Sequence, residues 1–172
     1  MAVTLYNKTK MDDDVILAFI ERADQLLQLS SDIEVKVTQA HNNIKPGAYF
    51  RDRPTANHEC LIHLRIPPFV SNWDAIPTHE VDAWCRRAAD WFELVVRHEF
   101  THGWQRENLP HWDEPSFNGR PPGSRRRRNW GQRPVEIDCE ARQDNILAEP
   151  GSEDEEYVDF LKEYFIHELR TH

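Results

Sequence analysis

Two histidines four residues apart stand in the stretch VVRHEFTHGWQ, which covers residues 95–105. In an α-helix, positions four apart lie on one face, so His98 and His102 can bind a single metal ion together. Neutral imidazole is a good ligand for zinc. Glu99 lies about 100° further round the helix, where its carboxylate can reach a water molecule on that ion. This pattern is typical of a metal site with a general base beside it.

The helix that must carry these residues, predicted at 79–105, has a strongly apolar face. Six apolar residues fall on the side of the two histidines and Glu99: Cys85, Ala88, Trp91, Phe92, Val95 and Val96. Burying an unpaired carboxylate and two imidazoles there is costly, and a bound metal offsets that cost. The alternative interpretation is a pair of histidines that ordinary hydrogen bonds satisfy inside a helical core.

A catalytic zinc site needs a third protein ligand. The extended pattern H-E-x-x-H-x-x-G-x-x-H is excluded, because Gln105 and Asn108 stand where it needs glycine and histidine. The stretch RPVEIDCEARQDN offers Glu136 and Glu140 on one face of a helix that begins with proline. We therefore predict that this helix supplies the third ligand.

The cluster HWDE at 111–114 is the alternative source of that ligand. His111, Asp113 and Glu114 follow the histidine motif closely in the chain. They lie in the segment 106–133, which is rich in proline and glycine and is predicted to be a long loop.

HEFTHGWQ followed by PVEIDCEA resembles the gluzincin branch of zinc metallopeptidases. More narrowly, the two stretches are similar to small prokaryotic and phage-type zincin-like proteins, in which a P-x-E-x-E-A pattern carries the ligand in its first glutamate. That glutamate is Glu136 here, with Asp138 in place of the second acid and Cys139 in place of the alanine. A second match at Glu140 makes this residue the alternative ligand.

The resemblance implies a zinc-dependent peptidase with one zinc per chain, held by His98, His102 and Glu136. Glu99 would act as the general base of a metal-activated water. His111 and His167 are candidates for the group that stabilises the oxyanion. A peptide or protein substrate would add along an edge strand, which we expect at 59–66.

Two other functions fit the same residues. The first is a zincin-fold binding or regulatory module that keeps the metal site without turnover. The second is a zinc-free helical interaction protein, in which HEFTH is a chance string.

The remaining sequence predicts one α+β domain over residues 1–172. A small, mostly antiparallel sheet of about three strands should pack on the long helix of the histidine motif, followed by the glutamate-bearing helix and a C-terminal helix. Periodicity predicts the strands at 33–39, 47–51 and 59–66, and the helices at 12–29, 79–105, 134–148 and 157–169.

Composition restricts the partners. The formal net charge of −9 argues against nucleic acid and anionic membranes as partners. The four arginines at 125–128 are an exception, for which a solvated loop is the simpler interpretation.

No apolar segment precedes the first helix, so we expect a cytoplasmic protein, either monomeric or a small oligomer, and the resemblance adds a possible phage origin. The three cysteines form no Cys-x-x-Cys pair, so we expect free buried thiols and no cysteine-based zinc site.

Overall fold

The structure is a computed structural model, which describes residues 2–40, 47–52, 58–66, 77–120, 122–123, 128–145 and 153–171. The elements follow in the order β1 (Val3–Asn7), α1 (Asp13–Leu27), β2 (Ile33–Gln39), β3 (Gly47–Arg51), β4 (Cys60–Ile66), α2 (Thr78–Asn108), the 3-10 turn η2 (Trp130–Gln132), α3 (Pro134–Asn145) and α4 (Glu153–Thr171). The α+β class predicted from the sequence is confirmed.

The four strands of the described residues form one mixed sheet in the order β1-β2-β4-β3. β1 pairs with β2 and β2 with β4 in parallel, and only β3 and β4 are antiparallel. The prediction of about three mostly antiparallel strands was therefore wrong in number and direction. Parallel neighbours need a crossover connection, and α1 provides it between β1 and β2. Periodicity does not predict β1, because its five residues carry a weak alternation.

The strand predicted as the edge strand lies inside the sheet. β4, which covers most of 59–66, is bordered by β2 on one side and by β3 on the other. The edge next to β4 is β3, where Phe50 stands opposite Ile62. The order of strands depends on contacts between distant segments, which periodicity within one segment does not report.

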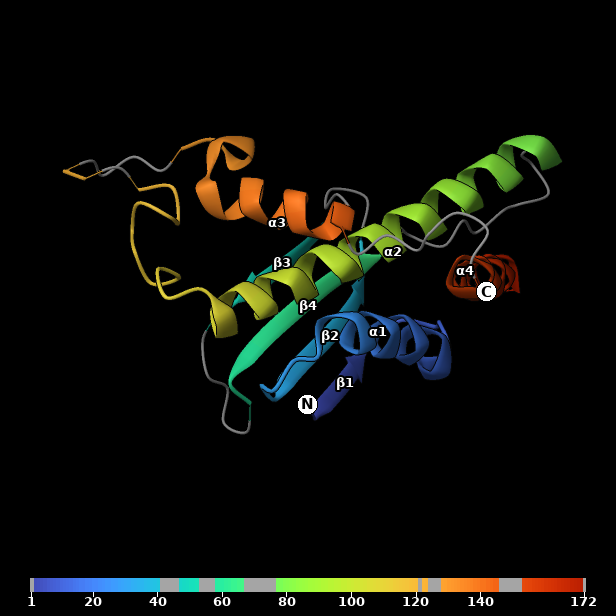
Figure 1. Cartoon of the computed structure of the whole chain (residues 1–172). Coiled ribbons are helices and arrows are strands. Elements are labelled where there is room, and N and C mark those ends of the chain that lie inside the picture. Colours follow the sequence, from blue (N-terminus) through green and yellow to red (C-terminus); the bar gives the residue numbers. More distant parts are fainter. Residues whose placement is uncertain are drawn as a thin grey trace.

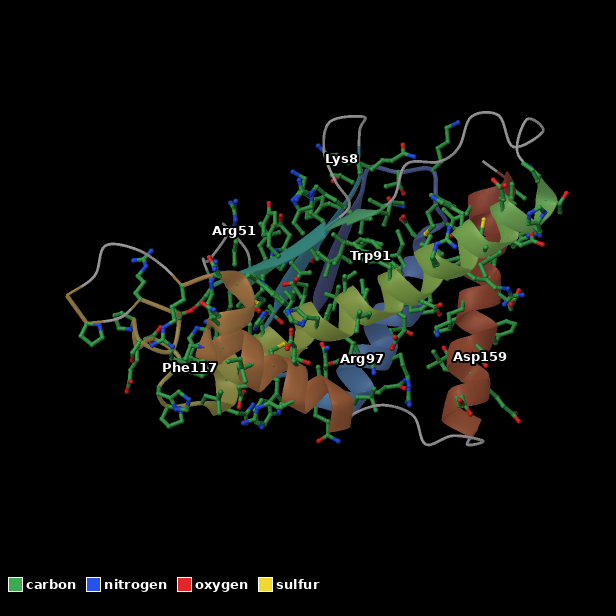
Figure 2. All side chains as sticks on the ribbon, turned by 90° about the horizontal axis from the view of Figure 1, so that it is seen from above. Lys8, Arg51, Trp91, Arg97, Phe117 and Asp159 are labelled. Atoms are coloured by element: carbon green, nitrogen blue, oxygen red, sulfur yellow. The ribbon has the colours of Figure 1, made fainter. Side chains whose placement is uncertain are left out.

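The helices lie on one side of the sheet (Figure 2). α2 runs across it, with α1 and α3 flanking α2 and α4 beside its first half (Figure 1). The core-facing residues of β2 and β4 are fully buried, as strict alternation predicts: Ile33, Val35, Val37, Cys60, Ile62, Leu64 and Ile66.

Gly103 lets α2 approach the sheet closely beside the histidine motif. A Cβ atom at this position would lie 3.3 Å from Leu29 Cδ1 and 3.8 Å from Phe50 Cε2.

α2 continues to Asn108, so the first residues of the loop predicted at 106–133 are helical. Most of the arginine run at 125–128 and the predicted helix end at 148 lie outside the described residues. Within the described chain, no helix is long and apolar enough to cross a membrane.

Phe92→Ala is expected to lower the free energy of unfolding by about 3–5 kcal/mol, because truncating a buried aromatic leaves a cavity. The Phe92 ring is fully buried, stacks on Phe165 at 4.7 Å and meets Phe19 edge-on at 5.2 Å. Denaturant unfolding measures the change. Leu94→Ala on the same helix is the control, since Leu94 is 42% exposed and should change stability by no more than about 0.5 kcal/mol. Equal losses in both variants would contradict the core described above.

Candidate metal centre

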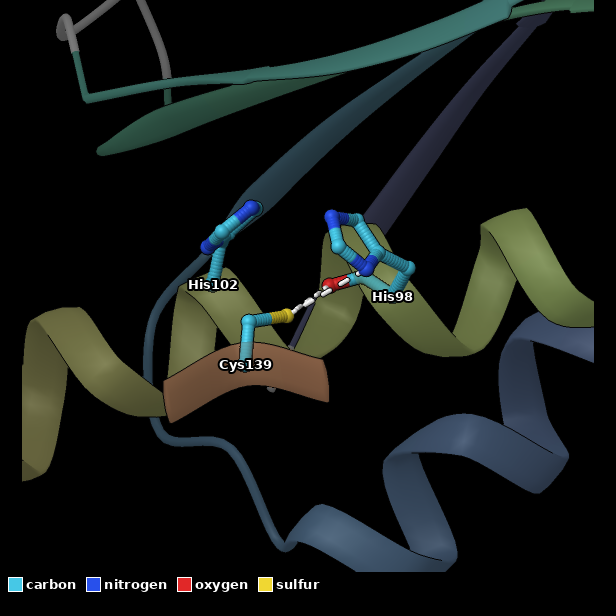
Figure 3. A group of neighbouring side chains, drawn as sticks. All are labelled: His98, His102 and Cys139. Carbon is cyan, nitrogen blue, oxygen red and sulfur yellow. Dashed lines mark hydrogen bonds between the residues drawn. The ribbon is translucent and has the colours of Figure 1, made fainter. Parts of the chain in front are cut away.

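The candidate centre lies where α2, α3 and β3 meet. α2 contributes His98, Glu99 and His102, and α3 contributes Glu136 and Cys139. The helical spacing places the two imidazoles on one face of α2, with ring centroids 4.8 Å apart. Cys139 faces them from α3 (Figure 3). His102, Glu99 and Glu136 are each only 6–7% exposed.

Both histidine rings contact the same carboxylate oxygen. Oε2 of Glu136 lies 3.1 Å from Nε2 of His102 and 3.4 Å from Nε2 of His98. Glu140, one turn further along α3, is exposed and is not part of this group. The structure therefore brings Glu136, and not Glu140, to the two histidines.

Glutamine side chains hold the opposite nitrogens of both imidazoles. His98 Nδ1 lies 3.0 Å from Gln143 Oε1, and His102 Nδ1 lies 2.7 Å from Gln105 Oε1. An amide oxygen only accepts, so each Nδ1 carries the hydrogen and donates it. Each Nε2 atom then faces Oε2 of Glu136, to which it donates only when the ring is protonated, and in the neutral ring it offers the lone pair that binds a metal ion.

Gln105 cannot be turned round, because its amide nitrogen has two acceptors of its own. Nε2 of Gln105 donates to the carbonyl oxygen of Val135 at 2.9 Å and to Oδ2 of Asp138 at 2.7 Å. Arg142 holds that carboxylate with two further hydrogen bonds of 2.6 and 3.0 Å. Burial raises the pKa of Asp138, but the bonds from Arg142 and Gln105 outweigh it and hold the pKa below its ordinary value. Val135 and Asp138 of α3 thus orient Gln105, and Gln105 in turn holds the hydrogen of His102 on Nδ1.

Gln105→Met is expected to weaken metal binding by about 10–100-fold, the usual effect of losing a partner that orients a metal-ligating histidine. Metal titration with a competing chelator measures it, and unfolding of the metal-free protein separates affinity from stability. Gln105→Glu should retain more affinity, because its carboxylate still accepts from His102. The exposed Gln132 on η2 gives the control variant Gln132→Met. Unchanged affinity in Gln105→Met would rule out the orienting role.

Cys139 also lies in this group, a position that was not predicted from the sequence. Its Sγ lies 3.4 Å from Nδ1 and 3.4 Å from the carbonyl oxygen of His98. His98, His102 and Cys139 each offer a ligand atom within 4.8 Å of the others, so this buried group could hold a metal ion. The three cysteines are free and buried, as predicted. Burial, followed by the charge of Glu136, raises the pKa of the Cys139 thiol well above its ordinary value.

Charge in the centre is unevenly distributed. Burial raises the pKa of Glu136, but the hydrogen bonds to His102 and His98 outweigh it and lower that pKa to about 2. Burial lowers the pKa of His98, but the bond to Glu136 and the charge of Glu99 raise it above its ordinary value. Glu136 is therefore an anion that the two imidazoles stabilise.

Glu99 differs from Glu136 in its surroundings. Burial raises the pKa of Glu99 above its ordinary value, with His102 and His98 opposing the shift. A backbone hydrogen bond from Phe50 places the carboxyl group between α2 and the edge strand β3. Oε2 of Glu99 is buried and has no hydrogen-bond partner within the described part of the chain. A proton acceptor with an unused oxygen thus lies beside the histidine pair.

The other residues singled out from the sequence lie outside this group. His111 packs edge-on against Phe117 at 4.4 Å. Asp113 and Glu114 are both exposed, and Asp113 lines a neighbouring cavity. His167 is exposed on α4. This helix packs beside the first half of α2, where Lys162 forms an ion pair with Asp90.

The residues that the sequence analysis missed carry a helical signal. Cys139 and Gln143 follow Glu136 on α3 at steps of three and four, and Gln105 follows His102 on α2 at a step of three. Such steps place side chains on one face of a helix. The face of α3 that begins with Glu136 is therefore visible in the sequence.

Comparison with known proteins yields no match among family models, curated proteins or solved structures.

Proposed function

We propose that the protein is a zinc-dependent metallopeptidase, with His98, His102 and Glu136 as zinc ligands and Glu99 as general base. The convergence of both Nε2 atoms on Oε2 of Glu136 carries this proposal. Ligand atoms of a tetrahedral zinc centre lie about 2.0–2.1 Å from the ion, and hence about 3.3 Å from one another. Two of the three distances among the proposed ligand atoms, 3.1 and 3.4 Å from Glu136 Oε2 to the Nε2 atoms of His102 and His98, are close to that value.

The donor set also agrees with zinc chemically. Two neutral imidazoles and one carboxylate are a common set in catalytic zinc sites, where the fourth position is left to water. Cys139 faces Nδ1 of His98, the nitrogen already bonded to Gln143, and so lies on the other side of that ring from Glu136. We therefore assign Glu136 rather than Cys139 as the third ligand.

In this proposal Glu99 transfers the proton, and the water and the carbonyl group are activated by the bound zinc. Zinc, when bound, lowers the pKa of a water molecule and polarises a carbonyl group. Glu99 accepts the water proton at its unpartnered Oε2 and later passes that proton to the leaving amine. Its raised pKa brings it closer to the working pH than an exposed glutamate would be, which favours transfer in both directions.

The edge strand β3 is where we expect the substrate to lie. Among the described strands it pairs with β4 alone, and its residue Phe50 donates a backbone hydrogen bond to the Glu99 carboxyl group. An extended peptide can add to such an edge through main-chain hydrogen bonds. β3 takes the role that the sequence analysis assigned to residues 59–66.

The test is hydrolysis of an unfolded protein by the zinc-loaded chain, followed by mass spectrometry of the products. We expect cleavage that stops when zinc is removed and returns when it is restored. Stoichiometric zinc without cleavage of a broad set of unfolded proteins would overturn the peptidase proposal. That result would favour the alternative, a binding or regulatory module that keeps the metal site.

A further inference from the structure

A cavity of about 250 Å³ opens beside the candidate metal centre. His102 and Glu136 form part of its wall, so a group inside the cavity lies next to the proposed reaction site. Its remaining lining comes from β3 and the segment after it, the turns that follow α2, and the start of α3: Phe50, Asp52, Trp112, Asp113, Asn118 and Val135.

The apolar walls of this cavity are held in place. The Trp112 indole packs against Phe50 at 5.9 Å and donates from Nε1 to Oδ2 of Asp52 at 2.9 Å. The carbonyl oxygen of Trp112 accepts from Asn118 at 2.7 Å. Val135 is 3% exposed and completes this apolar lining. The two rings offer a preformed apolar surface for an aliphatic side chain.

The charges of the cavity are not balanced. Asp52 pairs with Arg106 at 2.6 Å, and Glu136 has Arg133 at 3.8 Å. Asp113 is the third carboxylate of the lining, and no cation within the described residues pairs with it. The cavity therefore combines the apolar faces of Phe50 and Trp112 with a mostly polar lining that carries one unmatched negative charge.

We infer that this cavity is a subsite for a lysine or arginine side chain next to the scissile peptide bond, with Asp113 as the specificity-determining carboxylate. The inference rests on the proposed peptidase function. Lysine and arginine carry a long aliphatic stem with a cation at its end. The stem can lie along Phe50, Trp112 and Val135, and the cation can pair with Asp113. An acidic side chain at the same position would meet repulsion.

Matched peptides test the subsite. The peptides differ only beside the scissile bond, where they carry lysine, methionine or glutamate, and each side of the bond is varied in turn. We expect kcat/KM to be about tenfold higher for lysine than for glutamate on one side, because attraction and repulsion at a partly exposed charge each contribute a few-fold. Equal values for lysine and glutamate on both sides would contradict the inference and leave the peptidase proposal intact.

Variants of Asp113 assign the effect to that carboxylate. Asp113→Asn should bring the lysine-to-glutamate ratio close to one, and Asp113→Lys should reverse it. Glu114→Lys is the control, because the neighbouring exposed carboxylate does not line the cavity and the ratio should persist. A preference for lysine that survives Asp113→Lys would overturn the assignment.

Failure of the proposed function gives a different result. If the zinc-loaded chain cleaves none of the peptides, the peptidase proposal fails. Fluorescence anisotropy of the same labelled peptides then decides the subsite by itself. Tighter binding of the lysine peptide that is lost in Asp113→Lys would support it, and equal binding of all peptides would overturn it.

Discussion

Glu99→Gln is expected to reduce peptide hydrolysis by about 10²–10⁴-fold, the range that a positioned general base contributes. Glutamine keeps the size of the side chain but cannot accept the proton. Glu99 is not among the proposed ligands, so zinc should remain at one ion per chain. Initial rates on an unfolded protein substrate, together with zinc content by elemental analysis, measure both quantities.

The structure also predicts that this variant remains folded. Oε2 of Glu99 is a buried oxygen without a hydrogen-bond partner in the described chain, and burial penalises the charged form of the group. A neutral amide removes that penalty, so the unfolding temperature of the metal-free protein should not fall. Glu80→Gln, in the exposed first turn of α2, is the matched control and should leave activity unchanged. Full activity in Glu99→Gln would eliminate Glu99 as the base.

Zinc content should depend on His98, His102 and Glu136 and on no other carboxylate or thiol of the site. His102→Ala and Glu136→Gln are expected to weaken zinc binding by more than the 10–100-fold typical of an outer partner, because each removes a direct ligand. Glu136→Gln keeps the size and a hydrogen-bonding oxygen, which protects the fold. Elemental analysis after dialysis against a zinc buffer measures the occupancy.

Two further variants distinguish the possible donor sets. Glu140→Ala should retain zinc, because Glu140 is exposed and lies away from the histidines. Cys139→Ala should also retain it if Glu136 is the third ligand. Zinc that is lost with Cys139 and kept in Glu136→Gln would instead select the buried group of His98, His102 and Cys139.

The sequence predicted those parts of the site that depend on local helix geometry. A rotation of about 100° per residue is enough to place His98 and His102 together and Glu99 beside them. The apolar stripe of α2 is visible in the same way, since its residues recur every three or four positions and become buried: Val81, Cys85, Ala88, Phe92 and Val96.

The arrangement of strands could not be predicted in this way. The alternation in 33–39 and 59–66 shows which residues face the core, but it is the same for a parallel and an antiparallel neighbour. β1 completes a parallel β-α-β unit with α1 and β2, while β4 lies inside the sheet because β2 pairs with one of its sides and β3 with the other. The edge beside β4 is therefore β3 and not residues 59–66, since strand order arises from pairing between distant segments.

By itself, the sequence determined how the two histidines and the glutamate of α2 lie relative to one another, because all three stand on a single helix. Only the tertiary structure decided what meets them. The packing of α3 on α2 turns Glu136 and Cys139 inward and leaves Glu140 in solvent. The docking of Trp112 between Phe50 and Asp52 forms the cavity that Asp113 lines. These features depend on the rotation and approach of separate elements, which the burial of side chains across the whole fold determines.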